Sequence, residues 1–392
     1  MPSVLIVRGY SPAPWELGPW LELPDRYEVS YLCTGANRLV TPDGLRTVPV
    51  RALRDLLPRG PLGELSAMVV GNRYLSAEEA FAEVDIVHGA ELSCWFAADA
   101  ARRRRRHGFR LVQTVWETLP LLVAYRNRHA RRFREQVLAE TDLFLPVTER
   151  AALALQLEGV APDRITLCPP GIDTARFAPA HRVATGQAPE GHTIVSPGRL
   201  VWEKGHQDVL RALALLHRGN IRTPAGETVR PRLRIIGAGP EESRLRAYAA
   251  DLGLSDAVEI RSVPYEEMPK VFAGASAMVL ASQAVAKAAL HPLDIPRAFW
   301  EEQFGFVLAE AMAARLAIVS TTSGAIPEVV QGAPVELVAP GDWPAIARAL
   351  AAGPLSRPAG ARVSYPPEIV RRYSSTAAAE RLAAVYDRLL AA

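Results

Sequence analysis

The chain has 392 residues, of which 49% are apolar, and its formal net charge is +3. This length accommodates two domains with cores of their own, and the composition excludes a disordered chain. The small net charge argues against a general nucleic-acid binder. No apolar run approaches the roughly 20 residues that span a bilayer, and the first residues do not resemble a signal peptide. Three cysteines without a C-x-x-C pair support neither a disulfide framework nor a zinc site, so we expect a cytoplasmic protein.

Twelve short β-rich runs alternate with helical patterns along the chain. In the first half they cover residues 3–9, 27–33, 85–89, 110–115, 142–148 and 164–171. In the second half they cover residues 193–200, 232–239, 257–263, 277–282, 316–324 and 334–340. Amphipathic stretches such as 205–219 and 243–254 lie between them. Such alternation predicts βαβ units with parallel sheets, in an α/β protein. Twelve strands are too many for one common doubly wound sheet, so we predict two Rossmann-like domains.

The domain boundary is predicted from a loss of periodicity. Residues 171–192 are rich in Pro, Gly, Ala and polar side chains, which is typical of a linker. We therefore predict an N-terminal domain over 1–170 and a C-terminal domain over 193–370. Open α/β sheets bind ligands at the carboxyl ends of their strands, so we expect an interdomain cleft to hold the site.

The segment WEEQFGFVLAEAMA, residues 300–313, places Glu302 and Glu310 on either side of Gly305. Apolar residues from Phe304 onward recur at i, i+3 and i+4, which predicts a helix against a core. The plain interpretation is one acid favoured by the helix dipole and one solvent-facing glutamate. The functional interpretation is a phosphate site at the helix start, with Glu310 on a ribose and Glu302 on a sugar hydroxyl.

The segment VSPGRLVWEKG, residues 195–205, follows a predicted strand with Arg199 and Lys204. Two cations in a turn are either solvated or a clamp for a diphosphate. Only three of the 45 Lys and Arg residues are lysines, so a lysine at this place is unexpected from composition.

The segment RLRIIGAGPEESRL, residues 232–245, partly matches a dinucleotide fingerprint through Gly237 and Gly239. The third glycine is replaced by Glu242, whose charge would repel a pyrophosphate. We therefore interpret this segment as a tight strand-to-helix connection rather than a nicotinamide site.

Candidate residues in the first half follow predicted strands. Gly9 is either a turn residue or a place where backbone approaches phosphate. His88 is either a structural histidine or a catalytic one, and Glu117 is a candidate base or hydroxyl partner beside Trp116.

Two arginine-rich stretches, Arg102–Arg106 and Arg126–Arg134, have no place in this scheme. They are either solvated helix faces or a surface that contacts an anionic membrane or an anionic acceptor.

The order of these motifs resembles the retaining GT-B glycosyltransferases of family 4. The resemblance covers about residues 194–335, through GRLVWEKG, IIGAGPEESRL, EQFGFVLAEAMA and SGAIPEVV. The first domain matches more loosely, through VLIVRGY, DIVHGAE and PPGID. Residues 371–392 are similar to the closing helix of that family, which returns towards the first domain.

The resemblance implies a role for each matching residue. Arg199 and Lys204, with the amides of Gly305, Phe306 and Val307, would hold the donor diphosphate, and Gly9 would approach it from the other domain. Further contacts implied by the resemblance are Glu302, Gln303, Phe304 and Trp116 to the sugar, Glu310 to the ribose, and Val263 and Met268 to the base. Many family members carry a histidine where this chain has Trp116, which puts the identity of the sugar in doubt.

The resemblance implies a retaining hexosyltransferase that uses a UDP-sugar or GDP-mannose and an acceptor hydroxyl of a glycan, lipid or small polar molecule. We expect no metal and no cofactor, because the cations and the helix start would meet the leaving charge. Alternatives are a sugar-nucleotide epimerase on the same frame, or a non-catalytic sugar or lipid binder. A phosphorylase would need a pyridoxal-phosphate lysine, and neither Lys270 nor Lys287 fits that role.

Overall fold

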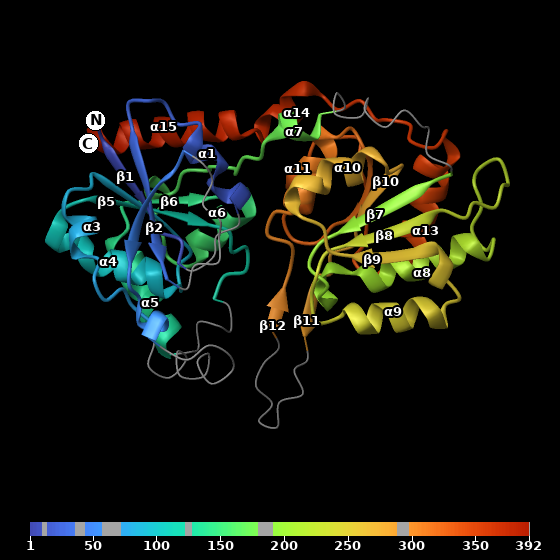
Figure 1. Cartoon of the computed structure of the whole chain (residues 1–392), viewed down its shortest axis with the longest axis horizontal. Helices are drawn as coiled ribbons and strands as arrows, with labels where there is room; N and C mark the ends of the chain where they lie inside the picture. Colours follow the sequence, from blue (N-terminus) through green and yellow to red (C-terminus); the bar gives the residue numbers. More distant parts are fainter. Residues whose placement is uncertain are drawn as a thin grey trace. The chain divides into compact units, whose positions relative to one another are not determined.

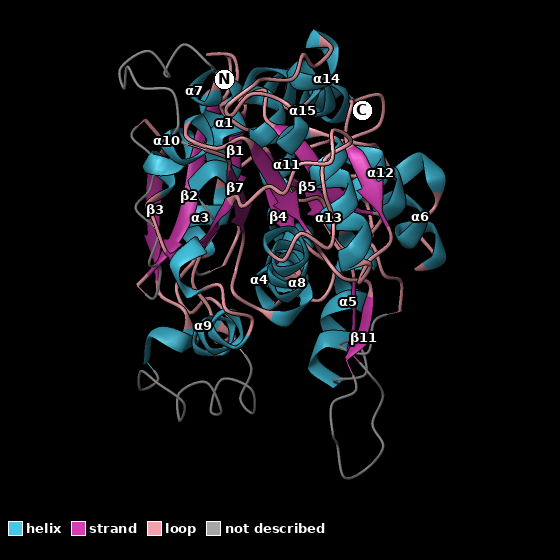
Figure 2. Ribbon diagram, turned by 90° about the vertical axis from the view of Figure 1, so that its right-hand side faces the viewer, coloured by secondary structure: helices cyan, strands magenta, loops and turns pink. Residues whose placement is uncertain are grey.

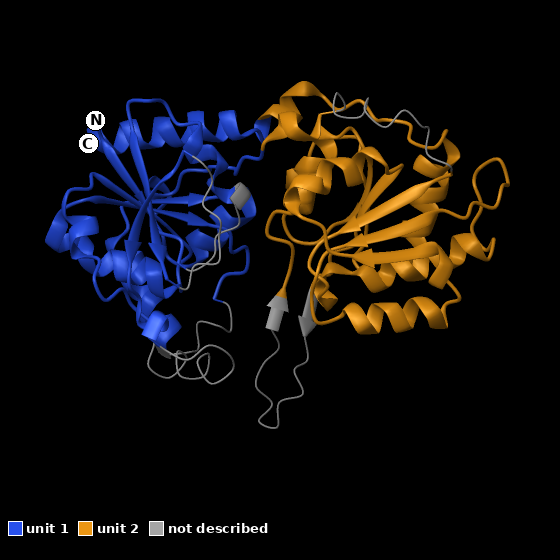
Figure 3. Cartoon of the chain, in the orientation of Figure 1, with its two compact units in different colours: residues 1–172, 291–297, 372–392 blue, residues 173–290, 298–371 orange. Residues whose placement is uncertain are grey.

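The computed structural model describes residues 1–9, 14–35, 44–56, 72–121, 128–178, 191–287 and 298–391. The chain forms two compact units, which are coloured separately in Figure 3. Unit 1 contains Met1–Ile172 and Arg372–Ala392, and unit 2 contains Asp173–Leu290 and Ala298–Arg371.

Unit 1 is built on one parallel sheet of six strands in the order β3-β2-β1-β4-β5-β6 (Figure 1). The strands are β1 (Ser3–Ile6), β2 (Glu28–Thr34), β3 (Arg46–Val50), β4 (Ile86–Ala90), β5 (Arg110–Val115) and β6 (Leu143–Pro146). The helices are α1 (Gly18–Leu21), α3 (Glu78–Ala82), α4 (Trp95–His107), α5 (Arg128–Glu140), α6 (Glu149–Leu157) and α15 (Ser375–Ala391). Strand β4 is buried along its whole length because helices cover both faces of a parallel sheet.

The prediction of a strand at residues 164–171 is wrong. Only an isolated bridge between Phe144 and Ile165 forms there, and the prolines at 169 and 170 remove two ladder donors. The sixth strand is instead β3, which pairs with β2 alone at the sheet edge. An edge strand tolerates Pro49, and its exposed residues hid the strand pattern in the sequence.

Unit 2 repeats this architecture, with a parallel sheet in the order β14-β13-β10-β7-β8-β9. Its strands are β7 (Thr193–Pro197), β8 (Arg232–Ile236), β9 (Val258–Arg261), β10 (Ala277–Leu280), β13 (Ala317–Thr321) and β14 (Glu336–Val338), and all six runs predicted in this half are present. An antiparallel hairpin of β11 (Val285–Lys287) and β12 (Ala298–Trp300) was not predicted.

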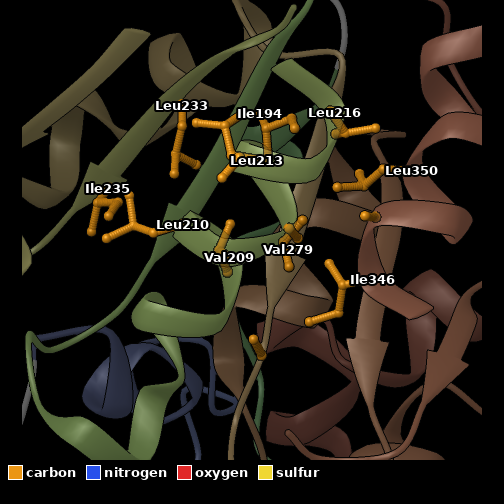
Figure 4. Close-up of a cluster of buried hydrophobic side chains, with 14 of the residues drawn as sticks. Ile194, Val209, Leu210, Leu213, Leu216, Leu233, Ile235, Val279, Ile346 and Leu350 are labelled. Carbon is orange, nitrogen blue, oxygen red and sulfur yellow. The ribbon is translucent and has the colours of Figure 1, made fainter. Parts of the chain in front are cut away.

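The helices of unit 2 pack against both faces of its sheet. They are α7 (Thr174–Phe177), α8 (His206–His217), α9 (Glu242–Asp251), α10 (Met268–Ala273), α11 (Phe306–Ala313), α12 (Ile326–Val329), α13 (Trp343–Ala352) and α14 (Pro367–Arg372). Figure 4 shows one core, in which Leu210 and Leu213 of α8 face Ile194, Val279 and Leu350.

Numbered within each unit, both sheets have the strand order 3-2-1-4-5-6, the doubly wound order of Rossmann folds. The direction of winding reverses between β1 and β4 in unit 1 and between β7 and β10 in unit 2. The predicted α/β class with two Rossmann-like parallel sheets is therefore confirmed, and the carboxyl end of each reversal point is where ligands bind in such sheets.

Figure 2 shows the helices in cyan and the strands in magenta, with α15 labelled. Helix α15 belongs to unit 1 although it follows the whole of unit 2 in the sequence. It contributes Leu382, Val385 and Tyr386 to a core with Trp20, and Trp20 Nε1 donates to the Tyr386 hydroxyl at 2.9 Å. Within the described ranges, no helix is both long and apolar enough to cross a membrane.

Candidate functional site

The loop after β7 is held against the loop after β10 by a glycine. Gly205 has φ +71°, and a Cβ atom there would lie 1.8 Å from the Ala281 carbonyl oxygen. No other residue fits this place, so the chain turns tightly after Lys204 and begins α8. The loop that carries Arg199 and Lys204 is therefore fixed at the carboxyl end of the reversal point.

Lys204 and Glu302, 98 residues apart in the sequence, form an ion pair. The Lys204 Nζ atom donates to both carboxylate oxygens of Glu302, at 2.9 and 2.6 Å, and their side chains are only 14% and 7% exposed. Ser282 Oγ, fully buried after β10, donates to the same carboxylate at 2.5 Å. The Lys204 ammonium also lies 5.2 Å from the centre of the Trp300 ring, over its face.

The backbone of Glu302 is held by the turn that contains Ser323 and Gly324. Its N–H donates to Ser323 Oγ at 3.1 Å, and its carbonyl accepts from Ala325 N at 2.9 Å. A Cβ atom on Gly324 would lie 2.1 Å from the Glu302 carbonyl oxygen. The segment SGAIPEVV therefore fixes the Glu302 backbone beside Lys204.

Helix α11 begins next to this ion pair. Its N-cap is Gly305, with φ +77°, and a Cβ atom on Gly305 would lie 3.5 Å from Glu302 Cγ. No side chain caps the helix, and Phe306 and Val307 remain partly exposed. The start of α11 and the Lys204 ammonium thus both lie close to the Glu302 side chain, and both are attractive to an anion.

Arg199 lies on the same loop as Lys204. Its carbonyl oxygen accepts from His206 Nε2 at 3.2 Å, and its side chain is exposed. Its neighbour Gly198 lies against the Lys204 stem, with a Cβ position 3.7 Å from Lys204 Cδ. Within the described ranges the guanidinium forms no ion pair, so it is available to an incoming anion.

Glu310 lies in the second turn of α11 and is 3% exposed, so the alternative of a solvent-facing glutamate is wrong. Burial raises its pKa to about 7, and the nearby Tyr265 side chain opposes that rise. Tyr265 lies between the predicted base contacts Val263, partly exposed, and Met268, buried. The sequence analysis missed Tyr265, because a single tyrosine in a turn carries no spacing signal.

Two further residues were predicted to contact the sugar. Gln303 is partly exposed, whereas Phe304 is only 2% exposed. The Phe304 ring contacts the Phe306 ring edge to face, with 5.2 Å between the ring centres. The Phe304 ring therefore packs in the interior, and a sugar contact from this residue stays a prediction.

The segment with Gly237 and Gly239 is a close packing contact. Cβ atoms at these positions would lie 1.9 Å from the Gly198 carbonyl oxygen and 2.4 Å from that of Leu200. Leu200 N donates to the Ala238 carbonyl at 2.9 Å. The glycines therefore admit the Arg199 loop, in agreement with a tight strand-to-helix connection.

His88, in β4 of unit 1, is enclosed. Its Nδ1 lies 2.6 Å from the Tyr386 hydroxyl and its Nε2 lies 2.7 Å from Thr114 Oγ1. Burial moves its pKa well below the usual range, so the ring is neutral at pH 7. These contacts are what we expect of a structural histidine, and a catalytic role for His88 stays a prediction.

Other unit 1 candidates lie at the carboxyl edge of its sheet. Gly9 has φ +73°, and a Cβ atom there would lie 2.6 Å from the Phe96 ring, so close packing alone requires this glycine. Glu117 accepts from Leu119 N at 2.8 Å, and the Trp116 N–H donates to Glu91 at 3.0 Å.

Glu91 itself was missed by the sequence analysis. It has φ +66°, a rare conformation for a side chain of this kind. The pKa of its carboxyl group is raised to about 7, mainly by the loss of solvent around it and to a smaller extent by the nearby charge of Glu117. A strained, half-buried acid at this edge is a candidate for acceptor contact, and nothing in the sequence pattern reveals its backbone angle.

Each arginine of the run Arg102–Arg106 forms an ion pair, and in the second stretch Arg134 forms one. Arg104 contacts Asp142, Arg105 contacts Glu140 at 2.7 Å, and Arg134 contacts Glu158. Residues 126 and 127 lie outside the described residues. This pairing is typical of solvated helix faces, and contact with a membrane stays a prediction.

Comparison with protein families gives two adjacent matches. The model described as "Glycosyltransferase Family 4" matches residues 21–176, and the model described as "Glycosyl transferases group 1" matches residues 178–352. The two matches are adjacent in the sequence, and together they cover most of both units.

Several curated proteins are similar in sequence. A putative colanic acid biosynthesis glycosyltransferase WcaL of Escherichia coli is 30% identical over 50% of this chain and 43% of its own length. A GDP-mannose-dependent alpha-(1-6)-phosphatidylinositol monomannoside mannosyltransferase of Mycolicibacterium smegmatis is 34% identical over 41% of this chain and 39% of its own length. These two matches span less than half of each relative. A D-inositol 3-phosphate glycosyltransferase of Actinosynnema mirum is 28% identical over 83% of this chain and 78% of its own length.

Solved structures share the fold over the whole chain. Anabaena Alr3699/HepE in complex with UDP and glucose has a TM-score of 0.69 at 14% identity and covers 99% of this chain and 100% of its own. Sucrose-phosphate synthase from Thermosynechococcus elongatus has a TM-score of 0.68 at 16% identity and covers 100% of both chains. With its two six-stranded parallel sheets and its two adjacent family matches, the chain belongs to the family 4 glycosyltransferases of the GT-B fold.

Proposed function

We propose that this protein transfers a hexose from a nucleotide-diphosphate sugar to an acceptor hydroxyl and retains the anomeric configuration. The observation that carries the proposal is the Lys204–Glu302 ion pair beside the uncapped start of α11. The names of similar proteins, which include a mannosyltransferase and inositol-phosphate glycosyltransferases, support transfer of a sugar. The acceptor hydroxyl is that of a glycan, a lipid or a small polar molecule.

The leaving diphosphate would be held by fixed charges. An ammonium has three N–H donors, and Glu302 uses two of those of Lys204, which leaves one for a phosphate oxygen. Arg199 and the amides of Gly305, Phe306 and Val307 would supply further donors. Each such preorganised group is worth roughly 3–4 kcal/mol in a dry site.

The two acids on either side of Gly305 would bind hydroxyl groups. Glu302, held by Lys204 and Ser282, would accept from a hydroxyl of the transferred hexose. Glu310 would accept from the ribose, with the base near Val263 and Met268. The departing phosphate oxygen would take the acceptor's proton on the same face, so no protein nucleophile is needed.

We propose that no metal is required, since cations of the chain itself would meet the leaving charge. Treatment with EDTA is expected to leave turnover unchanged. A strict dependence on added Mg²⁺ would contradict this part of the scheme.

The donor is best identified by ligand stabilisation. UDP, GDP and ADP, each free and as a hexose conjugate, are compared by thermal unfolding, since a ligand adds RT ln(1 + [L]/Kd) to stability. One nucleotide is expected to stabilise unit 2 most, and the shift is expected to vanish in Lys204→Ala. Lys270→Ala, which changes an exposed lysine of α10, is the matched control.

Turnover is then tested by mass spectrometry with the preferred donor and a mixture of acceptors. A hexosylated acceptor supports the proposal. An epimerised donor without any acceptor product, or binding of nucleotides without turnover, would overturn it.

A further inference from the structure

A pocket of about 500 Å³ opens on unit 1. It lies between α4, the beginning of α5 and the segment Asn72–Tyr74. Helix α4 begins after the carboxyl end of β4, and its later residue Arg104 contacts Asp142 just before β6. The pocket extends along α4 from Asp99, in its second turn, to Arg106, and it contains none of the residues discussed for donor or acceptor.

Positive charge dominates the walls of this pocket. Four arginines face two acids, which leaves a formal excess of two positive charges. The arginines are Arg73, Arg102, Arg103 and Arg106, and the acids are Glu78 and Asp99.

Both acids are already engaged by these arginines. Asp99, 3% exposed at its side chain, contacts Arg102 and Arg103. Glu78 contacts Arg103 at 3.1 Å and Arg106 at 3.4 Å. An anion that enters the pocket therefore meets carboxylates whose charge is already neutralised by arginines. The guanidinium groups have five N–H donors each, and some of these donors remain for the anion.

A neutral donor adds to this charge. The Asn72 Oδ1 atom accepts from the backbone N–H groups of Arg54 and Arg73, at 3.1 and 3.0 Å. These bonds fix the orientation of the carboxamide. Its Nδ2 group is buried and has no hydrogen-bond partner among the residues that the structure describes. A buried N–H donor without a partner is costly, and an acceptor oxygen in the pocket would satisfy it.

Helical spacing divides the run Arg102–Arg106 between two environments. Residues 99, 102, 103 and 106 follow i, i+3, i+4 and i+7 and line the pocket. Arg104 and Arg105 instead contact Asp142 and Glu140 outside it. The run is therefore not a uniform basic surface.

We propose that this pocket binds a phosphate monoester. Guanidinium forks match phosphate oxygens in pairs, and the Asn72 amide supplies a further donor. The volume lies within the usual range of about 300–1,000 Å³ for small-molecule sites and exceeds that of a bare phosphate. Tyr74 and Phe133 line the pocket beside the charged groups and offer apolar surface to the organic part of the ligand. The ligand is either a soluble phosphorylated compound or the headgroup of a phospholipid.

Two neighbouring arginines provide a matched test. Arg105 and Arg106 have side chains that are 80% and 73% exposed, but only Arg106 lines the pocket. Glycerol 3-phosphate is titrated by calorimetry into the full chain and its variants at a constant ionic strength of about 0.15 M. Arg106→Gln and Arg73→Gln are each expected to weaken binding about tenfold, and Arg105→Gln less than twofold. Glu78 keeps Arg103 and His107 as partners in Arg106→Gln, so this variant is expected to fold.

The outcomes separate the pocket from a charged surface and from the donor site. The proposal is overturned if Arg105→Gln and Arg106→Gln lose affinity for glycerol 3-phosphate equally. It is also overturned if the wild type shows no saturable binding at ligand concentrations up to about 10 mM, ten times a millimolar Kd. Vesicles of phosphatidic acid in phosphatidylcholine distinguish a phospholipid headgroup from a soluble phosphorylated compound. If the ligand is a headgroup, the wild type and Arg105→Gln sediment with the vesicles, and Arg106→Gln does not. Nucleotide stabilisation is expected to be unchanged in all these variants, so failure here leaves the proposed transferase activity untouched.

Discussion

Replacement of Lys204 by alanine tests the ion pair on which the proposed donor site depends. The variant leaves the Glu302 carboxylate, 7% exposed, with Ser282 as its remaining side-chain partner. Breaking a buried ion pair from one side costs about 3–5 kcal/mol. Since Lys204 keeps some contact with solvent, we expect about 3 kcal/mol, the lower end of that range. For a domain of this size, each kcal/mol lowers the thermal midpoint by about 2–4 °C.

A second substitution separates lost packing from stranded charge. Glu302→Gln in the Lys204→Ala background removes the uncompensated carboxylate, and we expect it to restore about 2 kcal/mol. Turnover of Lys204→Ala is expected to fall about 100-fold and to stay low in the double variant, because the cation for the diphosphate is still missing. Thermal unfolding of the two single variants, the double variant and Lys270→Ala measures the coupling. If Lys204→Ala unfolds at the wild-type midpoint and keeps the wild-type rate, the reasoning is refuted.

Three other substitutions test separate features. The pKa of Glu310 is about 7 against an ordinary value of 4.5, so the folded chain holds this proton more tightly than the unfolded chain. We therefore expect the wild type to lose stability relative to Glu310→Gln as pH rises from 4.5 to about 7, with no further relative loss above pH 7. If the stabilities of the two proteins change in parallel with pH, this expectation is contradicted. Gly205 and Gly253 share φ values of +71° and +73°, but only Gly205 has backbone where a Cβ would lie; Gly253→Ala is expected to cost about 1 kcal/mol in chemical denaturation and Gly205→Ala clearly more, whereas equal costs would count against the close approach. Tyr386→Phe removes the hydroxyl that contacts His88, and we expect a loss of about 1–3 kcal/mol with little change in turnover; a large fall in turnover at unchanged stability would instead favour a catalytic histidine.

The fold was largely predictable because buried parallel strands are continuous apolar runs. All six predicted strands of unit 2 are present, and its central strands β7 and β10 are buried along their whole length. The error in unit 1 concerns its edges. Strand β3 has a proline and exposed side chains because only one of its sides pairs, while residues 164–171 are apolar yet contain too many prolines for a ladder.

The candidate site was predictable only where a motif carried it. No spacing rule relates Lys204 to Glu302, and their proximity depends on two loops that meet at the carboxyl end of one sheet. Ser282, Tyr265 and Glu91 were missed for the same reason. A serine, a tyrosine and a glutamate are common residues, and their importance here comes from burial, neighbours and backbone angle, which exist only in the folded chain.

The membership of α15 in unit 1 has a consequence for biosynthesis. The Tyr386 hydroxyl contacts both Trp20 and His88, so the interior of the first unit lacks these contacts until residues 375–391 have left the ribosome. About 200 residues separate Ile172 from Ser375, and translation at roughly 5–20 residues per second takes about 10–40 s to make them. During that interval unit 2 can fold to completion, while unit 1 still lacks the apolar side chains that residues 375–391 add to its core.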